Sequence, residues 1–186
     1  MLYFLAALRS AEVVPKTAAL FSPDSDLCFA DVTVTQPRGA TAACVTVVVK
    51  RSKTDQLGVG RTLPIAANPG SALDILSALP DWAKWRAHCG LVATVPLLVR
   101  DDGAPFTYHD FRGLLARVCV AAGLDPARVT SHSFRKGAAT TLAASGASDA
   151  DIKVLGGWKS NCFNIYVAPT DSHFARLQSV LANATL

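Results

Sequence analysis

The chain has 186 residues, of which 51% are hydrophobic and 17% are charged, and its formal net charge is +4 at pH 7. This length and composition allow one domain with a buried core, and they exclude a disordered or low-complexity chain. The mildly basic balance permits a polyanionic partner without requiring one.

The five cysteines are odd in number, widely spaced and without a CxxC pair: Cys28, Cys44, Cys89, Cys119 and Cys162. We expect small buried side chains in a reducing intracellular compartment, with no disulfide framework and no zinc site. The apolar start at 1–8 has no basic residue before it and is interrupted by Arg9, and the apolar stretch 89–99 is too short to span a bilayer. We therefore expect no export signal and no membrane segment.

The first part of the chain predicts one helix and a small antiparallel sheet. Apolar spacing predicts a helix over 2–14, which Pro15 ends. Segments 27–34 and 43–50 are rich in Val, Thr, Cys and Phe and predict strands, and segment 62–65, which follows a glycine-containing hairpin tip, predicts a third. Residues 36–39 indicate a turn, and Gly58 and Gly60 indicate a hairpin tip between the last two strands.

The remainder is predicted to be helical, in segments 71–79, 81–88, 107–122, 132–144, 149–155, 161–168 and 171–183. Ser131 is the candidate cap of the helix at 132, and Ser148 or Asp149 caps the next one. Trp82 and Trp85 are three residues apart, which favours core packing over a ligand site. The elements predict an α+β, mainly helical domain, in which a small antiparallel three-stranded sheet with its hairpin packs on a helical core.

One group of residues indicates phosphodiester chemistry without a metal. Such chemistry needs a nucleophilic side chain, fixed cations around the phosphate oxygens and an acid for the leaving oxygen. His132 and Arg135 share a helix face and could approach one phosphate together. Taken alone, however, a histidine at a helix start is more often a cap or surface residue, and Tyr166 alone is more often a packing residue.

The surrounding sequence carries more information than this pair. The run HSFRKGAAT begins at His132, GGWKS begins at Gly156, and Tyr166 follows Trp158 by eight positions. This order resembles the catalytic core of the tyrosine recombinases, the phage-integrase-like family, and is most similar to the recombinases of DIRS-like retrotransposons and Crypton elements. Upstream, LRSAEV around Arg9 is similar to the family's first arginine box, and SKTDQ around Lys53 to its hairpin lysine.

The resemblance implies a role for each of these residues. Tyr166 would be the nucleophile that forms a 3′-phosphotyrosyl bond and frees a 5′-hydroxyl. Arg9 and Arg135 would clamp the scissile phosphate. Lys53 would protonate the leaving oxygen, with Lys50 as a rival for that role.

Two more residues complete the implied set. His132 would assist proton transfer at the tyrosine or hold the phosphate. Trp158 stands where many relatives carry a histidine, and would supply an indole N–H and packing. Contacts with the DNA backbone are expected from five basic residues: Lys50, Arg51, Arg61, Lys136 and Lys159. No metal and no cofactor are expected, because the phosphotyrosine bond keeps the energy of the broken one.

The implied partner is double-stranded DNA, bound by a homodimer or tetramer on paired sites. We expect residues 1–186 to be a single catalytic domain, N-terminally truncated and without the helical DNA-binding domain that usually precedes it. The alternative is a non-catalytic DNA-binding remnant or domesticated module of the same fold. A type IB topoisomerase shares the chemistry, but the WKS segment favours a recombinase. Intracellular localisation follows from the substrate, and nuclear localisation if the host is eukaryotic.

Overall fold

The computed structural model describes residues 1–35, 43–53, 55, 57–167, 174–175, 178–179 and 182. The predicted turn at 36–39 and most of the predicted helix at 171–183 lie outside these residues. Three strands and five α-helices make up the described fold, together with short 3₁₀ turns. The predicted α+β class with a small antiparallel sheet is confirmed.

The sheet has the order β1-β2-β3, with all neighbours antiparallel (β1 Val32–Thr35, β2 Cys44–Val49, β3 Arg61–Ala66). Val47 of the central strand lies opposite Val32 on one side and Leu63 on the other. The strands predicted at 43–50 and 62–65 are therefore confirmed. The first half of the predicted strand 27–34 is wrong, because the Asp31 carboxylate accepts the Cys28 N–H at 2.7 Å and closes a 3₁₀ turn over Phe29–Asp31, η3.

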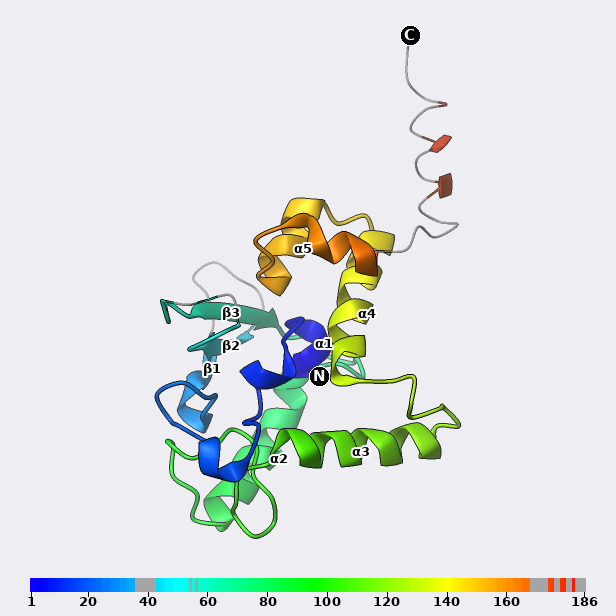
Figure 1. Ribbon diagram of the computed structural model, residues 1–186. Helices are drawn as coiled ribbons and strands as arrows, with labels where there is room; N and C mark the ends of the chain where they lie inside the picture. The colour runs from blue at the N-terminus through cyan, green and yellow to red at the C-terminus, as the bar shows by residue number, and fades with distance from the viewer. Residues whose placement is uncertain are drawn as a thin grey trace.

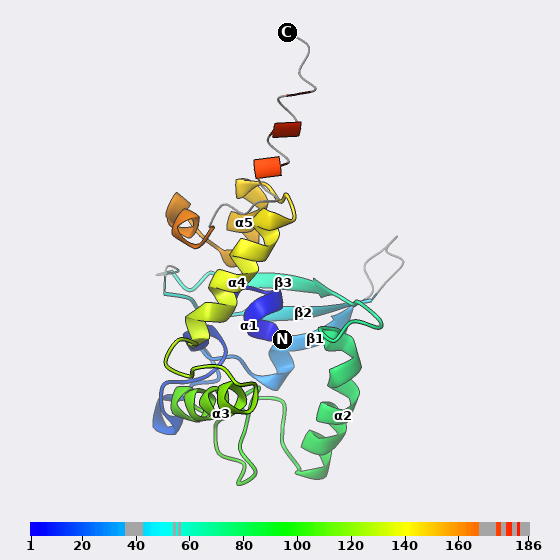
Figure 2. The same cartoon turned by 90° about the vertical axis from the view of Figure 1, so that its right-hand side faces the viewer.

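The helices surround this sheet on different sides (Figures 1 and 2). In Figure 1, α2 (Ile75–His88) and α3 (Tyr108–Ala121) lie below the sheet, while α4 (Ser131–Ala144) rises beside it and α5 (Asp149–Gly156) lies above. The short helix α1 (Leu2–Leu5) contacts α4, and the 3₁₀ turn η4 (Asn161–Tyr166) also packs on α4. Among the described residues, no helix is both long enough and apolar enough to cross a membrane.

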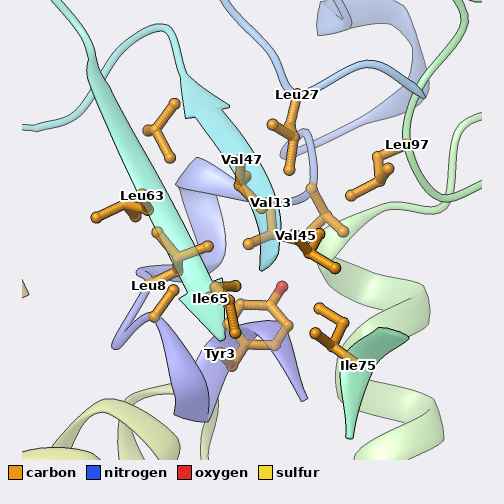
Figure 3. Close-up of a cluster of buried hydrophobic side chains, with 13 residues drawn as sticks. Tyr3, Leu8, Val13, Leu27, Val45, Val47, Leu63, Ile65, Ile75 and Leu97 are labelled. Carbon is orange, nitrogen blue, oxygen red and sulfur yellow. The ribbon is translucent and has the colours of Figure 1, made fainter. Parts of the chain in front are cut away.

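Two hydrophobic clusters hold these elements together. The larger one, shown in Figure 3, joins Tyr3 of α1 to the inward side chains of the sheet and to Ile75 of α2. The smaller one joins Ala138 and Ala139 of α4 to Ile152, Trp158 and Phe163. The smaller cluster therefore holds the C-terminal segments against α4 and fixes the turn that carries Trp158.

The helix predicted over 2–14 is wrong after its first turn. Helix α1 ends at Leu5, and Ala7 has a positive φ of 46°, which an α-helix cannot contain. Arg9 is extended, and its N–H donates to the Glu12 carboxylate at 2.8 Å, which starts a separate 3₁₀ turn, η1, over Ser10–Glu12. Because the helix ends before Arg9, this residue is not part of α1, and its side chain lines the cavity described below.

The segments predicted at 71–79 and 81–88 are one helix, α2, which contains Pro80. It begins after Asp74, whose side chain accepts the Leu76 N–H, so residues 71–73 remain outside. The core packing predicted for Trp82 and Trp85 is confirmed for Trp82 and wrong for Trp85. Trp82 packs on Phe29 with ring centroids 5.0 Å apart, whereas Trp85 is 36% exposed.

Helices α3, α4 and α5 lie close to their predicted positions at 107–122, 132–144 and 149–155. Helix α4 begins one residue earlier than expected, so Ser131 lies inside it and Thr130 is the cap. Ser148 rather than Asp149 caps α5, and its hydroxyl accepts the Asp151 N–H at 3.2 Å. In the predicted segment 161–168, residues Asn161–Tyr166 form the 3₁₀ turn η4, and residue 168 lies outside the described residues.

Candidate active site

A cavity of about 640 Å³ opens where three distant segments of the chain meet. The segments are the turn at Arg9, the hairpin between β2 and β3, and the turn after α5. The lining residues are Arg9, Glu12, Val49, Ser52, Asp55, Leu57, Val59, Gly60, Arg61, Gly157, Trp158 and Lys159. Three of them are cationic (Arg9, Arg61 and Lys159) and two are acidic (Glu12 and Asp55), so the wall carries a net positive charge that suits an anionic ligand.

Glu12 organises the cationic side of this cavity. Its buried carboxylate lies 3.1 Å from Nη1 of Arg9 and 3.5 Å from Nη2 of Arg61, and it also accepts the Arg9 backbone N–H. A single negative charge therefore holds two guanidinium groups, and a net positive charge remains at this wall. The Arg9 side chain is 23% exposed, so part of its donor fork still faces the cavity.

Arg135 lies behind Trp158 and is only 1% exposed. Its guanidinium donates Nη1 to the carbonyl of Ala7 and Nη2 to the carbonyl of Gly156, the latter at 2.7 Å. Its central carbon lies 3.9 Å from the centroid of the Trp158 ring. The two carbonyls and the indole fix the plane of the guanidinium, and they join the first residues of the chain to the end of α5.

Each of the two glycines before Trp158 is required at its position for a different structural reason. Gly157 ends α5 in the left-handed conformation, with a φ of 63°, which a residue with a side chain rarely adopts. A Cβ on Gly156 would lie 1.8 Å from the Trp158 ring, so the indole rests directly on the Gly156 backbone. Trp158 is buried at 7% and also contacts Phe163, with ring centroids 5.8 Å apart.

His132 is the second residue of α4 and is exposed. Partial desolvation of its ring lowers its pKa, and the positive charges of Arg135, Arg9 and Lys136 lower it further. The imidazole is therefore neutral at a lower pH than an ordinary histidine. A neutral imidazole can accept a proton, and the same cations show that His132 lies in the field of the two arginines.

Lys53 is exposed in the loop between β2 and β3. The loop is closed by Asp55, whose carboxylate accepts the N–H groups of Val59 at 3.1 Å and Gly60 at 2.7 Å. These backbone hydrogen bonds lower the pKa of Asp55. Ser52 and Asp55 line the cavity, so Lys53 belongs to a loop that contributes to the cavity wall, although it is not itself a lining residue.

Lys50, the rival for that role, has an internal set of partners. Its ammonium lies 2.6 Å from the Asp31 carboxylate and donates to the Pro23 carbonyl at 2.7 Å. Burial alone would lower the pKa of Lys50, but the hydrogen bond and charge of Asp31 raise it. The structure thus uses Lys50 to tie the 23–31 segment to the end of β2.

The other predicted backbone contacts divide into two kinds. Arg51, Lys136 and Lys159 are exposed, and Lys159 also lines the cavity. Arg61 is turned inward, and its Nη1 donates to the Leu155 carbonyl at 2.9 Å. The roles of all four in DNA binding stay predictions.

Tyr166 is the last residue of η4, which packs against α4. Its predicted role as nucleophile stays a prediction, since the description of this residue ends at its backbone. Among the described residues, no group of three or more His, Cys, Asp or Glu side chains could hold a metal ion.

Sequence reasoning missed Glu12, which lies three positions after Arg9 in the LRSAEV segment. That spacing was the available signal, because it allows the carboxylate to cap the same turn. The Gly156 and Ala7 carbonyls that hold Arg135 could not be found in this way, since they lie 21 and 128 residues from it.

Residues 41–173, more than half of the chain, match the model of the phage integrase family. The fold is similar to that of the XerH site-specific recombinase bound to a palindromic difH substrate, with a TM-score of 0.68 and 19% identity. That comparison covers 98% of this chain and 44% of that one. The Tn1549 transposon integrase in complex with circular intermediate DNA is also similar, with a TM-score of 0.57 and 18% identity over 96% of this chain and 57% of that one.

At these identities the structural similarity shows the fold alone. This chain spans about half the length of the two solved chains. A search of curated protein sequences gives no match.

Proposed function

Because the chain belongs to the phage integrase family, we propose that it cleaves and rejoins DNA strands through a 3′-phosphotyrosyl intermediate. The observation that carries this proposal is the joint placement of Arg9, Arg135 and Trp158 around one turn, although they come from distant parts of the chain. Arginine suits this task because its planar donor fork matches the oxygens of a phosphate and keeps its charge.

The proposed reaction keeps all bonds and charges balanced. The Tyr166 oxygen attacks the scissile phosphorus, the bond from phosphorus to the 5′ oxygen breaks, and a 3′-phosphotyrosyl bond forms. Lys53 supplies the proton that the leaving 5′ oxygen takes up, and the neutral imidazole of His132 accepts the proton of the tyrosine. Rejoining is the reverse attack by a 5′-hydroxyl, so no external energy source is needed.

Arg9 lines the cavity and stabilises the charge that develops on the non-bridging oxygens during both steps, and the buried Arg135 adds its fixed positive charge from behind Trp158. Arg9 has part of its side chain open to the cavity. Arg135 is buried, and its orientation is set by two carbonyls and the Trp158 ring before any substrate arrives. Such preorganised donors are the largest source of rate enhancement in many enzymes.

The proposal includes double-stranded DNA as the substrate and a dimer or tetramer on paired sites as the active assembly. We also propose that the chain is encoded by a DIRS-like or Crypton mobile element. Where the host is eukaryotic, it would act in the nucleus. The WKS segment that begins at Trp158 supports the recombinase assignment. The XerH and Tn1549 proteins were solved bound to DNA, which supports DNA as the partner.

The test is trapping of a covalent protein–DNA adduct on nicked suicide duplexes of randomised sequence. The expected result is an adduct that survives denaturation and is lost in Tyr166→Phe. Tyr108→Phe is the matched control, because the chain contains only three tyrosines and Tyr3 is buried. DNA binding without any adduct would contradict the proposal and favour a non-catalytic DNA-binding module of the same fold.

A further inference from the structure

Arg61 is the first residue of β3 and lines the same cavity as Arg9 and Trp158. From the sequence it is a candidate contact with the DNA backbone. Its side chain is only 21% exposed, however, and both of its terminal nitrogens have protein partners. Nη1 donates to the Leu155 carbonyl at 2.9 Å, and Nη2 lies 3.5 Å from the Glu12 carboxylate.

These two contacts join the three segments that form the cavity. Arg61 itself stands at the base of the hairpin that carries Lys53. Leu155 lies in the last turn of α5, immediately before the turn that carries Trp158, and Glu12 holds Arg9 at 3.1 Å. Because Arg61 contacts both Leu155 and Glu12, a displacement of its guanidinium would move Arg9 and the turn that carries Trp158 together.

The fit around Arg61 leaves little room for another arrangement. A Cβ on Gly157 would lie 2.8 Å from Nη1 of Arg61, so the guanidinium packs directly against the backbone of this turn. The side chain of Glu12 is 1% exposed, and a buried carboxylate is costly to leave without its cations. Glu12 and Arg61 thus depend on each other, and Arg9 is held through the same carboxylate.

We propose that Arg61 is a positioning residue for strand cleavage, which sets Arg9 and Trp158 through Glu12 and Leu155 and does not bind a DNA phosphate. This inference rests on the proposed function for its kinetic consequence. It differs from the phosphate-contact role in one measurable property. A side chain that neutralises a phosphate contributes to the salt dependence of DNA binding, whereas a positioning side chain leaves it unchanged.

The first experiment measures adduct formation at saturating suicide duplex and DNA affinity across a salt series. Arg61→Gln is expected to slow cleavage by about 10- to 100-fold, since small displacements of a catalytic group have effects of this size. Its salt slope should equal that of the wild type. Arg9→Gln should slow cleavage and also lower the slope by about 1, as expected for a lost phosphate contact.

Two further variants make the kinetic result specific. Arg61→Lys keeps a cation beside Glu12 and should recover part of the lost rate. Lys84→Gln, an exposed substitution on α2, should change neither rate nor slope. If Arg61→Gln lowers the salt slope by about 1 and leaves the rate at saturating DNA unchanged, Arg61 is a phosphate contact and the inference is overturned.

The second experiment does not depend on cleavage. The indole N–H resonance of Trp158, assigned with Trp158→Phe, is compared between variants of the DNA-free chain. Arg61→Gln should shift it, Arg61→Lys should shift it less, and Lys84→Gln should leave it in place. If the wild type forms no adduct, the proposed function fails while this comparison still tests the positioning role. An unmoved Trp158 resonance in a folded Arg61→Gln chain refutes that role.

Discussion

The guanidinium of Arg135 stacks on the ring of Trp158, with its central carbon 3.9 Å from the ring centroid. Both side chains are buried, and desolvated cation–π contacts of this kind contribute about 2 kcal/mol. The contact explains how a tryptophan can serve in this position. Its indole forms one wall of the cavity and at the same time orients the arginine behind it.

Replacing Arg135 by lysine should impair both stability and cleavage. A lysine keeps the charge but cannot reach the Ala7 and Gly156 carbonyls together, so one buried acceptor is left unpaired at a cost of about 1–3 kcal/mol. The rate of adduct formation should fall by about 100- to 1000-fold, as when one preorganised donor is removed. Urea denaturation and single-turnover cleavage measure the two effects. The neighbouring exposed substitution Lys136→Gln should stay within about 0.5 kcal/mol of the wild type, and an equal loss in both variants would contradict the assignment.

Removing the Trp158 ring should be among the most destabilising changes in the smaller cluster. Trp158→Ala is expected to lower the free energy of unfolding by about 3–5 kcal/mol, because the ring packs on Gly156 and Phe163. Trp85→Ala is the matched control, and its effect should be below about 1 kcal/mol since Trp85 is 36% exposed. Chemical denaturation followed by circular dichroism distinguishes the two. Similar losses in both would show that Trp158 is not held as described.

Two helical glycines should respond in opposite ways to the same substitution. Gly156→Ala places a methyl group against the Trp158 ring and should cost about 1–3 kcal/mol, as overpacking does. Gly137→Ala in α4 meets only Phe4, at 3.6 Å, which is an ordinary contact. It should stabilise the chain by about 0.4–1 kcal/mol through the lower entropy of the unfolded state. Thermal unfolding of both variants checks the signs, and a destabilised Gly137→Ala would refute the description of α4.

Substitutions of Lys50 and Lys53 should distinguish a structural role from a catalytic one. Lys50→Gln leaves the Asp31 carboxylate without its cation and should lower stability by about 1–3 kcal/mol. Lys53→Gln, on the exposed hairpin, should keep stability within about 0.5 kcal/mol and slow adduct formation. Denaturation curves and suicide-substrate kinetics are measured on both. A stable Lys50→Gln chain with slow cleavage would reverse the assignment in favour of Lys50.

The pKa of His132 should rise when a neighbouring cation is removed. Lys136→Gln is expected to raise it, because Lys136 is one of three cations that disfavour the charged imidazole. Lys153→Gln is the control, because Lys153 is not among those three cations. Proton NMR titration of the four histidines gives the values directly. Equal pKa values in the wild type and in Lys136→Gln would exclude this electrostatic coupling.

The same shift makes a prediction about stability. The pKa of His132 in the folded chain lies below its ordinary value of 6.5, so the unfolded chain binds more protons in the window below that pH. The contribution of His132 therefore favours folding above the window and is lost as the pH falls through it. His132→Gln should flatten the acid side of the stability curve, which urea denaturation at several pH values measures. An unchanged acid limb would show that His132 does not contribute to it.

The elements predicted best were those whose signals are local. The strand at 43–50, the helix that carries His132 and Arg135, and the short helix after Ser148 all follow from residue spacing and caps. The helix predicted over 2–14 failed because its end depends on a distant partner. Ala7 adopts a positive φ, and its carbonyl accepts Nη1 of Arg135, which is 128 residues away.

The functional roles of the basic residues show the same limit. Lys50 and Arg61 look like solvated cations in the sequence, as do Arg51 and Lys159. The folded chain turns Lys50 toward Asp31 and Arg61 toward Glu12 and Leu155, while Arg51 and Lys159 stay exposed. Nothing in the local sequence distinguishes these two pairs, because an ion pair depends on where another segment of the chain lies.

The sequence by itself determined the family pattern, the order of its boxes and the helices and strands that carry them, since these follow from residue types at short and regular spacing. Only the tertiary structure decided which cations face the cavity and which are held inside, and that Trp158 orients Arg135 from the turn after α5. The physical reason is that the partners of these side chains are buried carboxylates and backbone carbonyls. Folding brings them within bonding distance, and their separation along the chain leaves no local signal.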